Sequence, residues 1–339
     1  MIEKYLIKNE LTLKRYRTFK KSKRNVVATV IFLFILFISI TAEIWSNDKP
    51  LVLSYKGSIY FPVLKQHHPT VFGYDDILVM NYKLLLLQEE DWAIWPMIRW
   101  NPYESNKDVD VYPGEPSSSN WLGTDDRGRD VLSRLIYGFR YSITFAMLVW
   151  FFSFSSGIFI GGVMGYLGGK FDLITQRIVE VLSTVPQFFL LIILVSIFSA
   201  SMELLVLISS IFGWIFISYY VRAEFLKYRK REFVESARAM GSGHLRVILR
   251  HILPNALGPV LTFTPFVISG YIVGLASLEF LGFGLPPPTP SWGELLSQAE
   301  KHFTTAWWLA VYPASAMLVI LVLLNMIGEG LREAFSPKA

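Results

Sequence analysis

Six long stretches without a charged side chain set the pattern of this chain. They cover residues 25–42, 141–169, 181–202, 204–221, 252–278 and 303–328, and each holds at least 18 residues without Asp, Glu, Lys or Arg. A helix of about 20 apolar residues crosses the hydrocarbon core of a bilayer. The pattern therefore predicts an all-α polytopic membrane protein with six transmembrane helices.

The first apolar stretch predicts a retained transmembrane helix over residues 25–45 rather than a cleaved signal peptide. A signal peptide has an apolar core of about 7–15 residues and then a small-residue cleavage site. Here the apolar run is longer, a long basic segment precedes it, and it ends in TAEIWSND.

Lys and Arg are distributed unevenly among the polar segments. Residues 1–24 carry nine of them against two Glu, residues 227–251 carry seven against two, and residues 46–138 carry nine against thirteen acidic residues. Because basic loops stay inside, we expect a cytoplasmic tail over 1–24, both termini in the cytoplasm and a periplasmic loop over 46–138. Anionic membrane lipid accounts for the net charge of +5, so no nucleic-acid partner is expected.

The composition agrees with a membrane protein, since 53% of residues are hydrophobic and only 17% are charged, against about 25% charged in soluble domains. Residues 46–138 are too many for an ordinary connection, which indicates a structure or binding role of their own. Their aromatic run DWAIWPMIRWNPY fits either the membrane headgroup belt or a partner contact.

Residues 139–335 are expected to form a five-helix core. The second apolar stretch carries four glycines at near-helical spacing, Gly157, Gly161, Gly162 and Gly165. Small residues let helices approach closely in lipid, so packing is the favoured interpretation and a glycine-lined translocation path is the alternative. Pro186 should kink the third span because it removes a backbone hydrogen bond.

No catalytic or cofactor-binding motif is expected in this chain. GVMGYLGGKF differs from a phosphate-binding loop because Met164 replaces a glycine and Phe171 replaces the Ser or Thr that contacts Mg²⁺. The chain has no Cys, and its His residues are divided between the two sides of the membrane, so no metal site is predicted.

Acidic residues in the core lie near the expected ends of the helices. They are Glu180, Glu203, Glu279 and Glu329, and each is explained as an interfacial charge. A carrier driven by an ion gradient is expected to hold a polar site near the middle of the bilayer. An ion-gradient-driven secondary transporter is therefore the weaker alternative function.

A basic segment over residues 231–251 separates the fourth and fifth apolar stretches. Its spacing predicts two short amphipathic helices that meet at a Gly-Ser-Gly bend. The apolar stripe of the first is Phe233, Ala237 and Met240, and that of the second is Leu245, Ile248, Leu249 and Ile252. Glu235 can pair with Arg231 or Arg238, and Pro254 is expected at the start of the fifth span. Such an elbow fits a groove on another protein, and a helix lying on the membrane surface is the alternative.

The run GTDDRGRD precedes the second apolar stretch and begins with residues typical of turns. Thr124 or Asp125 is expected to cap a helix that continues into the membrane. Whether this run gates the outer entrance or only shapes it is left open by the sequence.

Several motifs together resemble one transporter family. ESARAMG followed by HILP resembles the conserved cytoplasmic loop of binding-protein-dependent ABC importer permeases; its motif positions are Glu235, Ser236, Ala237, Gly241, His251, Leu253 and Pro254. NWLGTDDRGRDVLSRLIYGFRYS, LASLEFLGFGLPPPTPSWGELL and LNMIGEGLREAF resemble the C-type subunits of dipeptide and oligopeptide permeases. The long outer loop is most similar to the Yej-type permeases implicated in peptide and microcin C uptake.

This resemblance implies the type I ABC importer permease fold in a bacterial inner membrane. It also implies a second homologous permease, cytoplasmic ABC ATPase subunits that bind ATP and Mg²⁺, and an extracytoplasmic peptide-binding protein. The 231–251 segment would hold the coupling helices, with Gly241 as the bend, Phe233, Ala237 and Met240 as docking area and Glu235 as a polar contact. The outer-loop motif positions would be Gly123, Thr124, Asp125, Gly128, Arg129 and Asp130.

Overall fold

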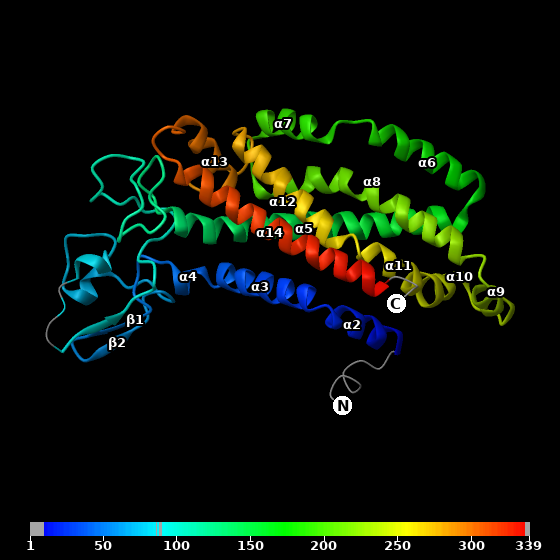
Figure 1. Ribbon diagram of the computed structural model, residues 1–339, viewed down its shortest axis with the longest axis horizontal. Helices are drawn as coiled ribbons and strands as arrows, with labels where there is room; N and C mark the ends of the chain where they lie inside the picture. Colours follow the sequence, from blue (N-terminus) through cyan, green and yellow to red (C-terminus); the bar gives the residue numbers. More distant parts are fainter. Residues whose placement is uncertain (1–9, 86, 88–89, 336–339) are drawn as a thin grey trace.

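The computed structural model describes residues 10–85, 87 and 90–335, so the first nine residues of the predicted tail lie outside it. Most helices run along the long axis of the molecule (Figure 1). A small sheet lies at one extreme, which we call the sheet end, and α9 (Glu232–Ala239) lies at the other, which we call the α9 end.

Helices account for most of the described chain. Before the core they are α2 (Glu10–Lys21), α3 (Lys23–Ile40) and α4 (Ala42–Trp45), with the 3₁₀ turns η1 (Pro69–Phe72) and η2 (Tyr82–Leu84). The core then contains α5 (Val131–Leu167), α6 (Gly169–Ser183), α7 (Gln187–Phe198), α8 (Met202–Tyr228), α9, α10 (His244–Arg246), the π-helix η3 (Val247–Ile252), α11 (Leu253–Leu261), α12 (Thr264–Phe280), α13 (Trp292–Lys301) and α14 (Trp308–Phe335).

Four helices in the described chain, α3, α5, α8 and α14, are each long and apolar enough to cross a membrane. Two further helix pairs are long and apolar enough only when their two members are taken together. They are α6 with α7, bent by 64°, and the run His244–Leu261 with α12, bent by 52°. The chain has six spans if each bent pair counts as one, so the six-span count stays a prediction. The bend expected at Pro186 is confirmed, and there the helix is broken outright between Ser183 and Gln187.

The second apolar helix begins earlier than predicted. α5 starts at Val131, inside the range 46–138 assigned to the outer loop. Its first turns carry Arg134 and Arg140, so the charge-free stretch begins only after them, at Tyr141. Both arginines are paired within the protein, with Glu294 and Glu43 respectively, so their charges do not interrupt the helix.

The outer loop contains a small folded unit, as its length indicated, and this unit adds a short sheet to the mostly helical fold. Three antiparallel strands, β1 (Val52–Tyr55), β2 (Ser58–Tyr60) and β3 (Trp92–Ile94), form a sheet in the order β2-β1-β3. One face covers an aromatic cluster that includes Leu53, Tyr55, Phe72 and Tyr82. Burial of such side chains stabilises the unit because each removes a large apolar area from water.

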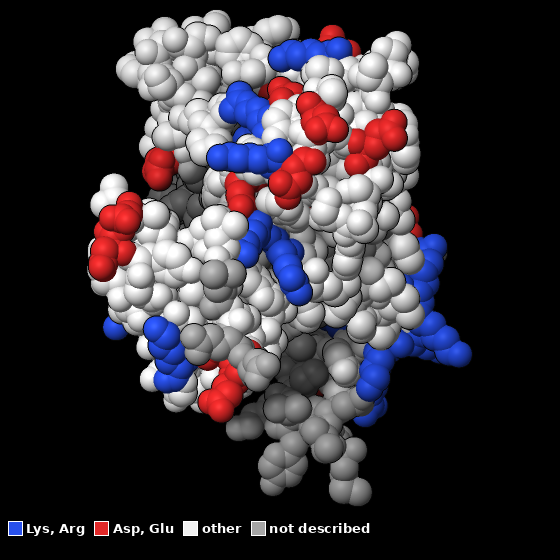
Figure 2. Space-filling model, turned by 90° about the vertical axis from the view of Figure 1, so that its left-hand side faces the viewer, with Lys and Arg blue, Asp and Glu red and all other residues white. Residues whose placement is uncertain are grey.

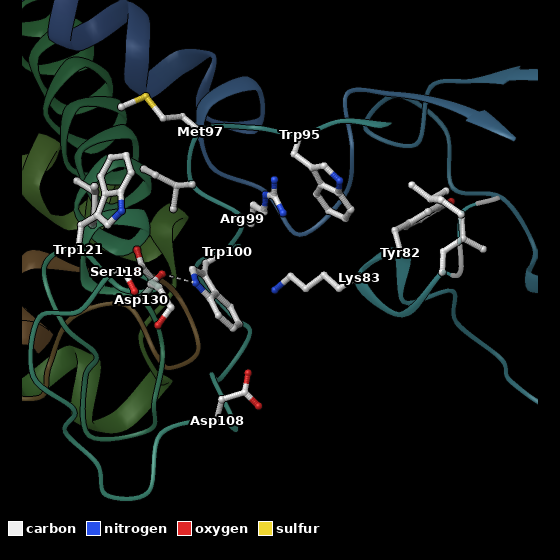
Figure 3. A pocket seen from close by; sticks show the side chains of 15 residues that line it. Tyr82, Lys83, Trp95, Met97, Arg99, Trp100, Asp108, Ser118, Trp121 and Asp130 are labelled. Atoms are coloured by element: carbon white, nitrogen blue, oxygen red, sulfur yellow. Dashed lines mark hydrogen bonds between the residues drawn. The ribbon is translucent and has the colours of Figure 1, made fainter. Parts of the chain in front are cut away.

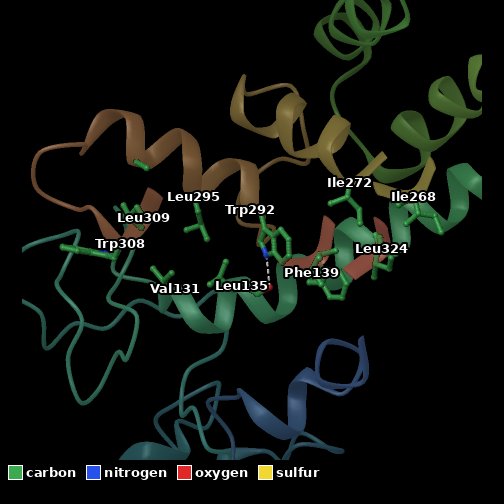
Figure 4. Close-up of a cluster of buried hydrophobic side chains, with 14 of the residues drawn as sticks. Val131, Leu135, Phe139, Ile268, Ile272, Trp292, Leu295, Trp308, Leu309 and Leu324 are labelled. Carbon is green, nitrogen blue, oxygen red and sulfur yellow. Dashed lines mark hydrogen bonds between the residues drawn. The ribbon is translucent and has the colours of Figure 1, made fainter. Parts of the chain in front are cut away.

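The main core lies where α5 meets α12, α13 and α14 (Figure 4). The Trp292 ring of α13 stacks on Phe139 of α5 with centroids 5.6 Å apart, and its indole N–H donates to the Leu135 carbonyl at 2.9 Å. Gly138 makes this possible, because a Cβ there would lie 2.9 Å from the Trp292 ring.

The glycines of α5 serve helix packing. A Cβ at Gly161 would lie 2.4 Å from the Ser218 carbonyl oxygen of α8, and one at Gly165 would lie 2.6 Å from the Arg222 carbonyl oxygen. The packing interpretation is thereby confirmed over the translocation-path alternative. Close backbone approach of this kind is how helices gain van der Waals contact in lipid.

α2 and α3 lie beside α14 on one side of the bundle (Figure 1). The Arg15 guanidinium of α2 lies 4.3 Å from the centroid of the Phe335 ring, and the Arg24 guanidinium of α3 pairs with Glu329 at 2.5 Å. Part of the basic tail is thus a helix that packs on the end of α14. Glu329, near that end, is paired with Arg24.

Substituting Gly161 tests the packing of α5 on α8. Gly161→Ala should lower the free energy of unfolding by about 1–3 kcal/mol, because the added methyl group meets backbone atoms that cannot move aside. Gly270→Ala in α12 is the control, since open space surrounds Gly270, and there replacing a helical glycine should raise the free energy of unfolding by about 0.4–1 kcal/mol. Unfolding titrations in detergent measure both. Equal stabilities for the two variants would contradict the packing role.

Candidate functional site

The predicted elbow, residues 231–251, protrudes at the α9 end (Figure 1). We call residues 231–254, which add the last motif positions Leu253 and Pro254, the elbow segment. α9 ends at Ala239, a turn follows, and α10 starts at His244. The two helices about a glycine bend are confirmed. The second is not a separate short helix, however, because α10 continues through η3 and α11 as one helical run into the fifth apolar stretch.

Gly241 is required by the backbone of the bend. Its φ is +82°, a left-handed conformation that costs residues with a Cβ about 1–2 kcal/mol. The Gly241 N–H donates to the Arg238 carbonyl at 2.9 Å, and the Ser242 N–H donates to the Ala237 carbonyl at 3.0 Å. This pair of bonds is the Schellman arrangement that ends a helix. Gly243 has an ordinary φ of −65°, which residues with a Cβ also adopt, so the backbone does not require glycine there.

The side chains of the elbow segment divide differently from the predicted stripes. Val234 is buried in one apolar cluster with Val247 and Ile252, which holds the elbow onto the bundle. Ala237 is buried as well. The predicted docking role of Ala237 is therefore wrong. The exposed apolar side chains are instead Phe233, Met240, Leu245 and Leu249, with Met240 81% exposed. The predicted second stripe is divided in the same way, since Ile252 faces inward while Leu245 and Leu249 face outward.

Glu235 and Ser236 are exposed on α9. Among the described residues, no ion pair joins Glu235 to Arg231 or Arg238, so its carboxylate is available to another molecule. Arg238 instead lies 5.4 Å from the ring centroid of Tyr166, at the end of α5.

Tyr166 is a functional candidate that sequence reasoning missed. Its hydroxyl and His244 Nδ1 are 2.6 Å apart, and its carbonyl accepts a bond from Arg229 at 3.2 Å. It therefore fixes the elbow segment to the end of α5. No local pattern identifies it, because its partners lie 63 and 78 residues later in the chain.

The remaining motif residues lie where the elbow segment enters the bundle. His251 is in η3, and its carbonyl accepts from the Asn255 side chain at 2.8 Å. Leu253 is partly buried against the same apolar cluster as Val247. Pro254 lies at the first turn of α11, directly after the π-helix. A proline crowds the carbonyl four residues earlier and supplies no N–H, which accounts for the wider turn before it.

The outer motif forms a buried ion network at the sheet end. The carboxylate of Asp125 accepts from the Arg129 side chain at 2.7 Å and lies 3.4 Å from Arg134 Nε. Arg129 also reaches Glu294 at 3.1 Å, and Arg134 pairs with the same carboxylate. Burial disfavours the charged guanidinium of Arg129, but Asp125 and Glu294 outweigh it and raise its pKa. The network joins the loop before α5, α5 itself and α13.

Asp130, rather than Thr124 or Asp125, caps α5, so the predicted cap is corrected. Asp130 accepts from the Ser133 N–H at 2.7 Å and from Asn120 at 2.9 Å, while its burial raises the pKa of the carboxyl. Thr124 accepts from the Gly114 N–H at 2.8 Å instead. The cap lies later in the chain than expected because Asp125 is held by Arg129 and Arg134.

Gly123 and Gly128 have positive φ values and make close contacts. A Cβ at Gly123 would lie 2.7 Å from the Trp308 indole nitrogen, and one at Gly128 would lie 2.4 Å from the Tyr112 ring. The outer motif is thus a rigid structural corner. Glu279 lies at this end of α12 as expected, but it is buried and accepts from the Gly293 N–H at 3.3 Å rather than facing the interface.

A groove of about 460 Å³ lies between α5, α7, α8 and α12. Its polar side chains include Gln187, Ser209 and Tyr271. Gly270 and Gly274 of α12 line it as well, and open space surrounds the position of a Cβ on each. The glycines that border open space in this groove are therefore on α12, not on α5.

Arg134 tests the ion network. Arg134→Met should destabilise the protein by about 3–5 kcal/mol, because it leaves one guanidinium, that of Arg129, to balance the two carboxylates of Asp125 and Glu294. Arg127→Met is the matched control, since Arg127 is 54% exposed and only 4.0 Å from Asp126, and should change stability by less than about 1 kcal/mol. Unfolding titrations in detergent compare the two. A loss below about 1 kcal/mol for Arg134→Met would refute the structural role.

Known proteins resemble this chain over nearly its whole length. It is 37% identical over 356 residues to the peptidoglycan transport system permease protein YejE of Agrobacterium fabrum, with 96% of this chain and 93% of that protein covered. It is 39% identical over 328 residues to the inner membrane ABC transporter permease protein YejE of Escherichia coli, with 95% and 96% covered. It is 33% identical over 304 residues to the dipeptide transport system permease protein DppC of Haemophilus influenzae, with 86% and 99% covered.

A solved structure of the MetNI methionine ABC transporter, in an inward-facing conformation, shares the fold. The TM-score is 0.50 at 18% identity, and the match covers 60% of this chain and 97% of that one. Residues 157–339 match the family described as Binding-protein-dependent transport system inner membrane component. This match, together with relatives that are at least 37% identical over most of the chain, assigns the chain to that family of inner-membrane permeases.

Proposed function

We propose that this chain is the permease subunit of an ATP-driven importer for peptides or peptide-like compounds. The relatives named as dipeptide, oligopeptide and peptidoglycan transport permeases support this substrate class. The Yej-type similarity extends the proposed cargo to microcin C-like compounds. An ion-gradient carrier has no such support. The observation that carries the proposal is the elbow segment, which is anchored by buried side chains and exposes apolar ones.

The proposed orientation places the α9 end in the cytoplasm and the sheet end in the periplasm. The excess of Lys and Arg over residues 1–24 and 227–251 supports it. Both termini are then cytoplasmic. ATP and Mg²⁺ would be bound by separate ATPase subunits, a second permease would complete the path, and an extracytoplasmic binding protein would deliver the peptide.

Coupling would act through the elbow segment. Phe233, Met240, Leu245 and Leu249 would enter a cleft on the ATPase, with Glu235 as a polar contact. ATP binding would favour one arrangement of the two ATPase subunits. The docked elbow segments would move with those subunits and so shift the membrane-spanning helices. Tyr166 and the buried Val234 make the elbow move with α5 and η3 rather than independently.

The groove beside α12 is the proposed peptide path. Gly270 and Gly274 leave space for a peptide, and Gln187, Ser209 and Tyr271 offer polar groups that its amides require. A buried amide without a hydrogen bond costs about 1–3 kcal/mol, so a purely apolar path would reject peptides.

Gly241 tests the coupling. Gly241→Val should reduce both co-purification of the ATPase and ATP-dependent uptake of labelled peptide by about tenfold or more, because a β-branched residue disfavours φ +82° by about 1–3 kcal/mol. Gly243→Val is the matched control, because φ −65° and the surrounding open space accept a side chain. If ATPase binding and uptake survive Gly241→Val, the coupling assignment is wrong.

Gly274 tests the path. Gly274→Phe should abolish uptake by filling the groove, while ATPase co-purification stays at the level of the unaltered protein. Gly274→Ala adds one methyl group to open space and should retain most uptake. Uptake by the Phe variant equal to that of the Ala variant would exclude this groove as the path. Normal ATPase binding separates a blocked path from a failure of coupling.

A further inference from the structure

A second cavity, of about 520 Å³, lies at the sheet end, where the outer unit meets the start of α5. We call it the outer pocket. Its walls include Lys83, Trp95, Arg99, Trp100, Asp108 and Trp121, drawn in Figure 3. A concave site of this size, with aromatic walls and a few polar groups, suits a small organic ligand.

Trp100 forms a fixed wall of the outer pocket. Its indole N–H donates to the Ser119 carbonyl at 2.8 Å, and Lys83 Nζ lies 3.5 Å from its ring centroid. Lys83 in turn pairs with Glu104 at 2.7 Å, with both side chains largely buried. The charge of Lys83 is thereby neutralised within the protein, and the Trp100 ring is held in place before any ligand arrives.

Two charged side chains of the outer pocket have no ion-pair partner among the described residues. Arg99 and Asp108 are exposed, and within the described chain neither side chain makes an ion pair. The Arg99 guanidinium lies over the Trp95 ring, 5.3 Å from its centroid. In Figure 3, Arg99 and Asp108 lie on opposite sides of Trp100. A free cation and a free carboxylate are therefore separated by an aromatic surface.

The fourth charged wall residue, Asp130, is not available to a ligand. Its two carboxylate oxygens already accept from Ser133 and Asn120, and the side chain is buried. The surrounding face carries Lys and Arg interspersed with Asp and Glu rather than a patch of one sign (Figure 2). This pattern disfavours polyanions and polycations, and it fits a ligand that carries one charge of each sign.

We propose that the outer pocket binds short zwitterionic peptides, with the peptide carboxylate on Arg99 and its ammonium group on Asp108. An apolar side chain would lie against Trp100 and Trp121, and Trp121 is 46% exposed. The inference rests on the proposed peptide importer. It gives the chain an extracytoplasmic binding site of its own, apart from the groove beside α12.

The full chain, purified and placed in lipid nanodiscs, is titrated with the tripeptide Ala-Leu-Phe and its C-terminal amide. The unaltered protein should bind the free acid about tenfold more tightly than the amide, because the amide lacks the negative charge that pairs with Arg99. Arg99→Gln should remove this difference. The third probe is the N-acetylated tripeptide, which the unaltered protein should bind more weakly than the free peptide because its ammonium charge is gone. Asp108→Asn should remove that second difference and leave the first. Lys65→Gln and Asp110→Asn are matched controls, because both residues are exposed and lie outside the pocket walls.

Equal binding of the acid and the amide by the unaltered protein would overturn the proposal. Equal effects of Arg99→Gln and Lys65→Gln on the acid-to-amide ratio of affinities would also overturn it. So would a pocket that binds a loop of the binding protein but not the tripeptide. ATP-dependent peptide uptake, measured in cells that produce the unaltered protein, separates a failure of the outer-pocket site from a failure of the importer function. If uptake is normal and binding does not discriminate, only the outer-pocket site fails. If no ATP-dependent uptake occurs, the importer function itself fails.

Discussion

Arg134, which has no exposed surface, is the residue on which the sheet end depends. Its guanidinium reaches the carboxylates of Asp125 and Glu294 and also the carbonyls of Pro102, Pro288 and Thr289. One buried cation therefore joins the outer loop, α5 and the connection into α13. Such a charge is tolerated only with its partners in place, so each of these segments depends on the others for its position.

The same helix carries this constraint to the other end of the molecule. α5 has 37 residues, which corresponds to about 55 Å at about 1.5 Å per residue. Arg134 lies in its first turn and Tyr166 in its last, where it holds the elbow segment. Between them, glycines bring α5 against the backbone of α8 without intervening side chains. A rigid, closely packed rod allows movement at the elbow to be transmitted as movement of whole helices rather than absorbed locally.

The apolar helices, the bend at Pro186 and the glycine bend at Gly241 could be predicted from the sequence, because each has a local cause. The inward and outward faces of the elbow could not. α9 has only eight residues, so Phe233 and Val234 are neighbours on a short helix and long-range packing decides which one is buried. The start of α5 was missed for a related reason, because the pairing of Arg134 with Glu294 spans 160 residues. The outer pocket is also formed by segments far apart in the chain.

The two cavities differ in a way that follows from their surroundings. The groove beside α12 is lined by glycines and uncharged polar groups, and a fixed charge within the bilayer would be costly to keep there. The outer pocket lies at the sheet end and carries Arg99 and Asp108, which make no ion pair within the described chain. The proposed charge recognition is therefore placed where water can solvate both charges, and the proposed passage is left to groups that any peptide backbone satisfies. On this division, selection by terminal charge belongs to the sheet end, and the groove discriminates by size.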